Sequence, residues 1–142
     1  MVPTFSGRLQ TRLLGLVLIG LPWTLLMSPV LAPLAGGIGP MLRIGLVTWA
    51  ATLGLGLVVW EPLYHLLMQF RWEKDWPALF FILEAVPEGA VVGWLLTTFG
   101  PGASWSVFLL LFAGTWLVVL GSLQGPLRVL FLRWRFRGGR VI

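Results

Sequence analysis

Long apolar stretches separated by short breaks dominate the pattern of this 142-residue chain. Four of them are long enough to cross a bilayer, whose hydrocarbon core of about 30 Å requires about 20 helical residues. They cover residues 13–34, 41–60, 77–99 and 104–123. The pattern predicts an all-α integral membrane protein, folded as a single domain (residues 1–142) that is a four-transmembrane-helix bundle.

The first apolar stretch follows two basic residues, Arg8 and Arg12, which is also the arrangement of a secretory signal. A signal peptide has an apolar region of about 7–15 residues and a small-residue cleavage site. This stretch is longer, and residues 32–35 (Ala-Pro-Leu-Ala) match such a site poorly. We therefore expect a retained anchor helix.

Between the second and third crossings, residues 62–70 have an amphipathic pattern. Apolar side chains recur at i, i+3, i+4 and i+7: Leu63, Leu66, Leu67 and Phe70. Polar side chains at four-residue spacing form the opposite stripe: Glu61, His65 and Gln69. Such a pattern is typical of a helix on the membrane surface, so we expect a short interfacial helix there. Tryptophans expected at the two membrane interfaces are Trp60, Trp72, Trp76 and Trp105.

Composition supports this class and suggests an orientation. Only 11% of residues are charged, and mean hydropathy is +0.92, whereas soluble domains are about one quarter charged. With four crossings, nine of the ten Lys and Arg residues fall on one side, and only Arg43 falls on the other. Because cytoplasmic segments are enriched in Lys and Arg, we expect both termini and residues 61–76 to be cytoplasmic, in a bacterial inner (plasma) membrane or its equivalent.

The absence of cysteine excludes disulfides, thiolate metal sites and cysteine nucleophiles. A single histidine, His65, excludes a bis-histidine haem held within one chain, and the single lysine, Lys74, lies in a charged loop where a buried Schiff base is not expected. No catalytic constellation is present, so an enzyme is not expected. No cofactor is required either, although ligation of one cofactor by His65 alone stays open.

Two carboxylates in the third crossing are the strongest candidates for function. A helix starting at Pro77 and rising 1.5 Å per residue places Glu84 about 10 Å deep and Glu88 about 16 Å deep, on one face. Acidic residues at such depth mark ion or proton pathways or polar contacts between helices. Both interpretations stay open. Pro87, between the two residues, weakens the local backbone hydrogen bonding of the helix.

Small residues form a second stripe on the same helix, at Ala85, Gly89 and Gly93. Four-residue spacing of small side chains lets another helix approach closely. We therefore expect this helix to be a packing centre, against a neighbouring helix or a partner chain.

Two further groups of residues were weighed as ligand or partner sites. Glu61 and His65, together with Glu84 and Glu88, are permissible metal ligands, but their spacing does not match a carboxylate metal bundle, and no metal site is predicted. The tail, residues 127–142, carries five arginines, which we expect to contact anionic headgroups rather than nucleic acid: Arg128, Arg133, Arg135, Arg137 and Arg140.

The sequence therefore leaves three functional hypotheses. The first is a small non-enzymatic membrane subunit, held in a larger complex, or self-associated, through the third helix and residues 61–76. The second is a small homo-oligomeric transporter or channel, coupled to protons or cations through Glu88. The third is a membrane protein that binds a metal or cofactor.

Overall fold

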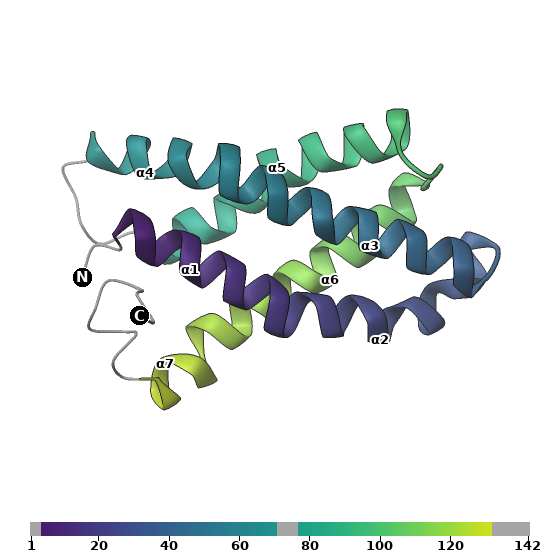
Figure 1. Cartoon of the computed structure of the whole chain (residues 1–142), viewed down its shortest axis with the longest axis horizontal. Coiled ribbons are helices and arrows are strands. Elements are labelled where there is room, and N and C mark those ends of the chain that lie inside the picture. The colour runs from purple at the N-terminus through teal and green to yellow at the C-terminus, as the bar shows by residue number, and fades with distance from the viewer. Residues whose placement is uncertain (1–3, 71–76, 132–142) are drawn as a thin grey trace.

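The computed structural model describes residues 4–70 and 77–131, with the side chains in these ranges except those of residues 77–81 and of Arg128. Within these ranges the chain is helical apart from short turns and contains no strand (Figure 1). The first rod joins four consecutive elements: α1 (Phe5–Gly15), the π-helix η1 (Leu16–Gly20), α2 (Leu21–Leu31) and the 3-10 helix η2 (Ala32–Ala35).

The second rod joins α3, a π-helix and α4, and three further helices complete the described chain. Their bounds are α3 (Ile38–Leu55), η3 (Gly56–Trp60), α4 (Glu61–Gln69), α5 (Pro77–Phe99), α6 (Trp105–Gln124) and α7 (Pro126–Leu130).

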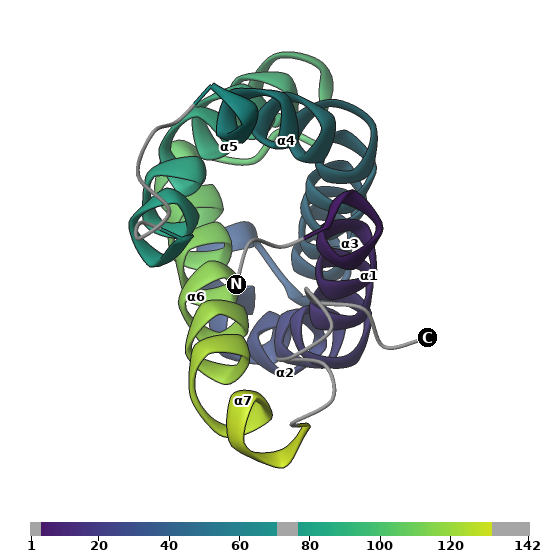
Figure 2. The same cartoon turned by 90° about the vertical axis from the view of Figure 1, so that its left-hand side faces the viewer.

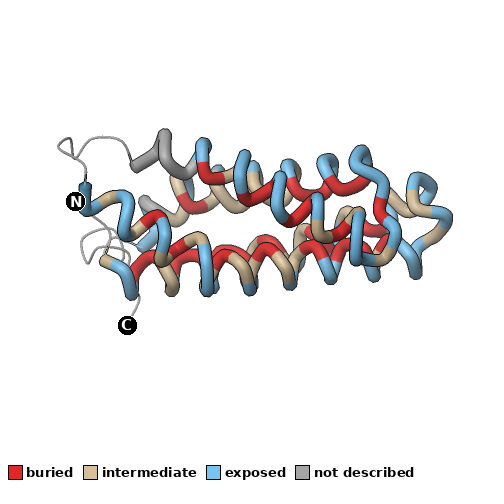
Figure 3. Tube along the Cα trace, turned by 90° about the horizontal axis from the view of Figure 1, so that it is seen from above, coloured by how far each residue is buried: buried red, intermediate tan, exposed pale blue. Residues whose placement is uncertain are grey.

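Four helical segments among the described residues are long and apolar enough to cross a membrane, which confirms the prediction of four spanning helices. They are Phe5–Ala35, Ile38–Gln69, Ile82–Phe99 and Trp105–Gln124, of 31, 32, 18 and 20 residues. Buried positions follow their inner sides and exposed positions their outer sides (Figure 3). The chain is therefore a multi-pass membrane protein whose apolar outer surface suits lipid.

The first rod begins eight residues earlier than the predicted start at residue 13. Thr4 caps it: its hydroxyl oxygen accepts a hydrogen bond from the backbone N–H of Gly7 at 3.1 Å. A straight 31-residue helix is about 46 Å long, well beyond the hydrocarbon thickness of about 30 Å. Arg8 and Arg12 therefore belong to the helix itself, near one end, and not to a segment preceding it.

Helix α4 covers residues 62–69 of the short helix predicted over 62–70, and it continues the second crossing without an intervening turn. Its position at the membrane surface stays a prediction. Helices α1, α4 and α7 lie at one end of the bundle, and the turn between η2 and α3 and that between α5 and α6 lie at the other (Figure 1). Viewed along the bundle, the four spanning segments surround a common centre (Figure 2).

Apolar side chains form two core clusters, which fix the far end and the α5–α6 contact. The first, which we call the apolar layer, lies near the turns opposite the α1 start and comprises Met41, Ile44, Ala103, Val107 and Leu111. The second comprises Val92, Leu96, Phe108 and Phe112. Helices α2 and α3 approach closely at Gly45, where an added Cβ would lie 2.9 Å from Cγ2 of Thr24.

Candidate functional site

Five charged side chains are buried together between the helices at the end of the bundle where α1 begins. Each is at most 8% exposed, and together they form what we call the ionic cluster: Arg8, Arg12, Glu61, Glu84 and Glu88. The arginines come from α1, one glutamate from α4 and two from α5. The cluster therefore ties three spanning segments together.

Glu61 is the bridge between the two arginines. Its Oε2 accepts a hydrogen bond from Nε of Arg8 at 2.6 Å, and its Oε1 accepts one from Nε of Arg12 at 2.7 Å. Both carboxylate oxygens are thus engaged by charged donors, which make shorter and stronger hydrogen bonds than neutral ones. Glu61 is therefore fully paired.

The two α5 glutamates are held differently. Glu88 accepts from both terminal nitrogens of Arg12, Nη1 to Oε1 at 2.6 Å and Nη2 to Oε2 at 3.0 Å, in a fork-like pair. Glu84 accepts from Nη2 of Arg8 through Oε1 at 2.8 Å. Its other oxygen, Oε2, is buried and has no hydrogen-bond partner among the described residues. Glu88 is thus satisfied and Glu84 is only half satisfied.

Helical periodicity explains why these residues meet. Arg8 and Arg12 are four residues apart and share one face of α1, and Glu84 and Glu88 share one face of α5 in the same way. Both pairs lie in the part of their helix nearest the same end of the bundle. Two stripes of opposite charge therefore face each other, and Glu61 accepts a hydrogen bond from the Nε of both arginines.

The two π-helices flank the cluster along the chain: η1 begins four residues after Arg12, and η3 ends immediately before Glu61. A π-turn widens a helix and shifts the phase of the side chains that follow, and it recurs at functional sites. Gly56, at the start of η3, lies directly under Arg12: an added Cβ would contact Nη1 and lie 2.6 Å from Cδ of that arginine. The absence of a side chain at Gly56 therefore makes room for Arg12.

The cluster carries unequal numbers of opposite charges. Within the described residues, three carboxylates face two guanidinium groups, so full ionisation leaves one negative charge in excess. An uncompensated charge in a low-dielectric interior is costly, and such a site gains a proton or a cation instead. The cluster can therefore bind and release one proton or cation while its ion pairs stay in place.

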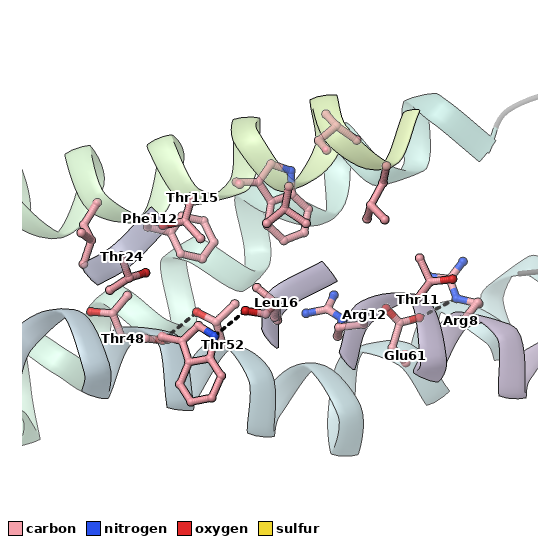
Figure 4. A pocket seen from close by; sticks show the side chains of 16 residues that line it. Arg8, Thr11, Arg12, Leu16, Thr24, Thr48, Thr52, Glu61, Phe112 and Thr115 are labelled. Atoms are coloured by element: carbon pink, nitrogen blue, oxygen red, sulfur yellow. Dashed lines mark hydrogen bonds and ion pairs between the residues drawn. The ribbon is translucent and has the colours of Figure 1, made fainter. Parts of the chain in front are cut away.

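A cavity of about 60 Å³ adjoins the cluster (Figure 4). Arg8, Arg12 and Glu61 lie at one end of it, and Thr24 and Thr48 lie at the other. Leu111 of the apolar layer also lines it. A cavity that binds benzene measures about 150 Å³, so this space is too small for an organic ligand of that size, and its lining is almost entirely apolar.

Three of the threonines that line the cavity are hydrogen-bonded within their own helices. Thr24, Thr48 and Thr52 each donate their hydroxyl hydrogen to the carbonyl four residues earlier, at 2.8 Å in each case. Their hydroxyl hydrogens are therefore already used, and each side chain has only its oxygen lone pairs left as acceptors.

The small-residue stripe makes its close contact within this chain. An added Cβ at Gly89 would lie 2.8 Å from Cε1 of Phe112, and one at Gly93 would contact Trp105 and lie 2.7 Å from Cε1 of Phe108, all on α6. Ala85, next in the stripe, is half-buried. The stripe thus provides the packing surface between α5 and α6.

The remaining predicted residues lie apart from the cluster. The ring of His65 packs 5.2 Å from that of Phe5, and its buried Nδ1 has no hydrogen-bond partner in the described part of the chain. Trp60 is half-buried and stacks on Tyr64, while Trp105 is 47% exposed at the opposite end of the bundle. No three His, Asp or Glu side chains of the described ranges are grouped so that they could hold a metal ion.

Some predicted contacts fall outside what is described. Arg128 lies in α7, but its side chain is not among those described. The predicted site residues that lie outside the described ranges are Trp72, Trp76, Arg133, Arg135, Arg137 and Arg140.

Sequence reasoning placed Arg8 and Arg12 only as determinants of orientation, and grouped Glu61 with His65. A signal for their true partners was present: two pairs at four-residue spacing, of opposite sign, on helices that start at the same side of the membrane. In comparisons with protein-family models, curated proteins and solved structures, nothing matches this chain.

Proposed function

We propose that this chain is a small proton-translocating membrane protein in which the ionic cluster binds the proton. One observation carries the proposal: three carboxylates and two guanidinium groups are buried together inside spanning helices, beside a small cavity that Arg8, Arg12 and Glu61 help to line. Ionisable groups at such positions are costly to bury, and they mark proton relays in membrane transporters. The proton is therefore the charge that the cluster exchanges.

The size of the cavity favours a proton over a larger substrate. Its volume of about 60 Å³ is well below the volume of about 150 Å³ of a cavity that binds benzene. The apolar layer lies toward the far end, with Met41 fully buried.

The path lies within one chain, between its own four helices, so an oligomer is not required to build it. The cluster faces the cytoplasm in this proposal, because the basic residues of the sequence gather on that side and favour it. A bacterial inner membrane or its equivalent, with its proton gradient, is the setting we propose.

Proton flux in reconstituted vesicles tests the proposal. Purified protein is placed in liposomes that carry a trapped pH dye, and a potassium diffusion potential drives protons inward. We expect the liposome interior to acidify several-fold faster than in protein-free liposomes. In a separate run driven by a pH gradient, the rate of acidification should be the same whether the external salt contains sodium or potassium. Equal rates with and without protein, at every potential tested, would contradict the proposal.

The hypothesis of a subunit in a larger membrane complex stays a prediction. Its motivation in the sequence is the absence of a catalytic constellation, together with short loops, the small-residue stripe and polar groups suited to contacts between helices. The close contacts of the stripe are made with α6 of the same chain. Purification in a mild detergent distinguishes the two: stoichiometric copurifying membrane chains support the subunit hypothesis, and an isolated chain that still conducts protons supports ours.

A further inference from the structure

Among the three buried carboxylates, Glu84 stands apart in how it is bonded. Glu61 and Glu88 each use both oxygens to accept hydrogen bonds from arginine. Glu84 uses one, and its Oε2 is a buried oxygen for which no described residue provides a donor. The side chain is 1% exposed, so bulk water does not reach it.

We infer that the cluster holds its exchangeable proton on Oε2 of Glu84. This inference rests on the proposed function and names the group within the cluster that carries out the exchange. With Glu84 neutral, two carboxylates balance two guanidinium groups, and every ionised oxygen has an arginine donor. Placing the proton on Glu61 or Glu88 would remove an acceptor from an arginine and leave the unpaired oxygen of Glu84 charged.

The groups facing Glu84 come from two other helices. On α1, Arg8 donates a hydrogen bond to Oε1 of Glu84, and Arg12 lies four residues farther along the helix. On α4, Glu61 accepts a hydrogen bond from the same Arg8. Tyr64 of α4 lies within electrostatic range, and its buried hydroxyl also has no hydrogen-bond partner in the described part of the chain. The hydroxyl of Tyr64 and Oε2 of Glu84 are therefore not hydrogen-bonded to each other in this structure.

The shared arginine couples two of the carboxylates. Arg8 donates to both Glu84 and Glu61, and Glu61 is one of the residues that line the cavity. A guanidinium keeps its proton, so Arg8 does not itself carry the exchanged proton. A change in the charge of Glu84 therefore reaches the cavity side of the cluster through the hydrogen bonds of Arg8.

Glutamine substitutions separate the neutral carboxyl from the ionised ones. Glutamine reproduces the acceptor and donor of a protonated glutamic acid, so Glu84→Gln should leave the thermal midpoint in detergent within a few degrees of the wild type. Glu88→Gln and Glu61→Gln remove a charge from a fully paired arginine and should lower the midpoint much more. Equal losses at all three positions would overturn the assignment.

Infrared difference spectroscopy identifies the proton directly. The wild-type protein should show the carbonyl stretching band of a protonated carboxyl, which disappears as the pH is raised. Shortening one side chain at a time assigns it: Glu84→Asp should move the band, while Glu88→Asp and Glu61→Asp should leave it in place. A wild-type spectrum without this band, or a band that moves with Glu88→Asp or Glu61→Asp, would overturn the inference.

These results are independent of transport. A band that moves with Glu84→Asp in a protein that conducts no protons removes the proposed function and keeps the assignment. Proton flux together with a band that moves with Glu88→Asp keeps the function and removes the assignment.

Discussion

The two ends of this bundle are held by different physics. At one end, five buried charged residues connect three helices through hydrogen bonds of 2.6–3.0 Å. At the other, the apolar layer packs without any charged group among its members. Ion pairs need specific partners at specific atoms, whereas apolar packing needs only matched volume. The ionic end should therefore respond to loss of charge, and the apolar end to loss of volume.

The largest effect is expected when an arginine of the cluster loses its charge. Arg12→Met leaves both oxygens of Glu88 and one of Glu61 without a donor, and breaking a buried pair from one side costs about 3–5 kcal/mol. Unfolding in mixed detergent micelles measures this. Arg43→Met is the matched control, because Arg43 is exposed; equal stability of the two variants would contradict the account.

The double variant Arg12→Met with Glu88→Gln sharpens this result. If Arg12→Met lowers the stability because it leaves the buried carboxylate of Glu88 without a donor, removing the charge of Glu88 as well should restore part of that stability. A double-mutant cycle measures the coupling, which we expect to be about 1–3 kcal/mol, within the range for residues in one network. Simple additivity would show that the Arg12–Glu88 pair does not act as a unit.

A smaller loss is expected from crowding the cluster without changing its charge. Gly56→Ala places a methyl group against Arg12, and overpacking of this kind costs about 1–3 kcal/mol. Gly54→Ala is the control in the same rod, near the end of α3, because nothing lies within 4 Å of its added Cβ. It should gain up to about 1 kcal/mol of helix propensity. The difference between the two unfolding free energies tests the fit of Arg12 over Gly56.

At the apolar end, Met41→Ala should cost about 2 kcal/mol, near the lower limit for a buried methionine. The value is low because lipid is itself apolar, which leaves the lost packing as the main term. The infrared carboxyl band should be unchanged, since Met41 lies in the apolar layer. A shifted band would mean that the two ends are not independent.

The smallest effect is expected where the π-helix η1 meets α3. Trp49 donates its Nε1–H to the carbonyl of Leu16 at 2.8 Å, and Trp49→Phe removes this bond while it keeps an aromatic ring. Hydrogen bonds between membrane helices average about 0.6 kcal/mol, so the unfolding free energy should fall by about that amount. Trp94→Phe, at an exposed position, is the control. An equal change in the unfolding free energy of both variants would show that the Trp49 hydrogen bond does not contribute to stability.

The same contrast shows how much of the molecule could be predicted from its sequence. Apolar length alone predicts the four spanning helices, because lipid requires every backbone group to be bonded within a helix. The common face of Glu84 and Glu88 also follows from periodicity, whereas their depth in the bilayer stays a prediction. Their partners did not follow from periodicity, because Arg8 and Arg12 had been placed before the first helix, where orientation alone explained them.

Tertiary geometry supplied the rest. The π-helix before Glu61 changes the phase of the residues that follow it, and a regular 3.6-residue period does not predict this change. The stripe at Gly89 and Gly93 predicted a close helix contact, but only the fold identifies α6 as the neighbour. The cavity between the threonines depends on three segments far apart in sequence.

Proton flux through vesicles containing Glu84→Gln tests the central claim most directly. The variant keeps every ion pair that Glu61 and Glu88 make, and a neutral side chain replaces the carboxyl that we assign as the proton carrier. Under a fixed potassium diffusion potential, the account predicts wild-type flux for Arg43→Met and the rate of protein-free vesicles for Glu84→Gln. Folded Glu84→Gln protein that conducts protons at the wild-type rate would contradict it.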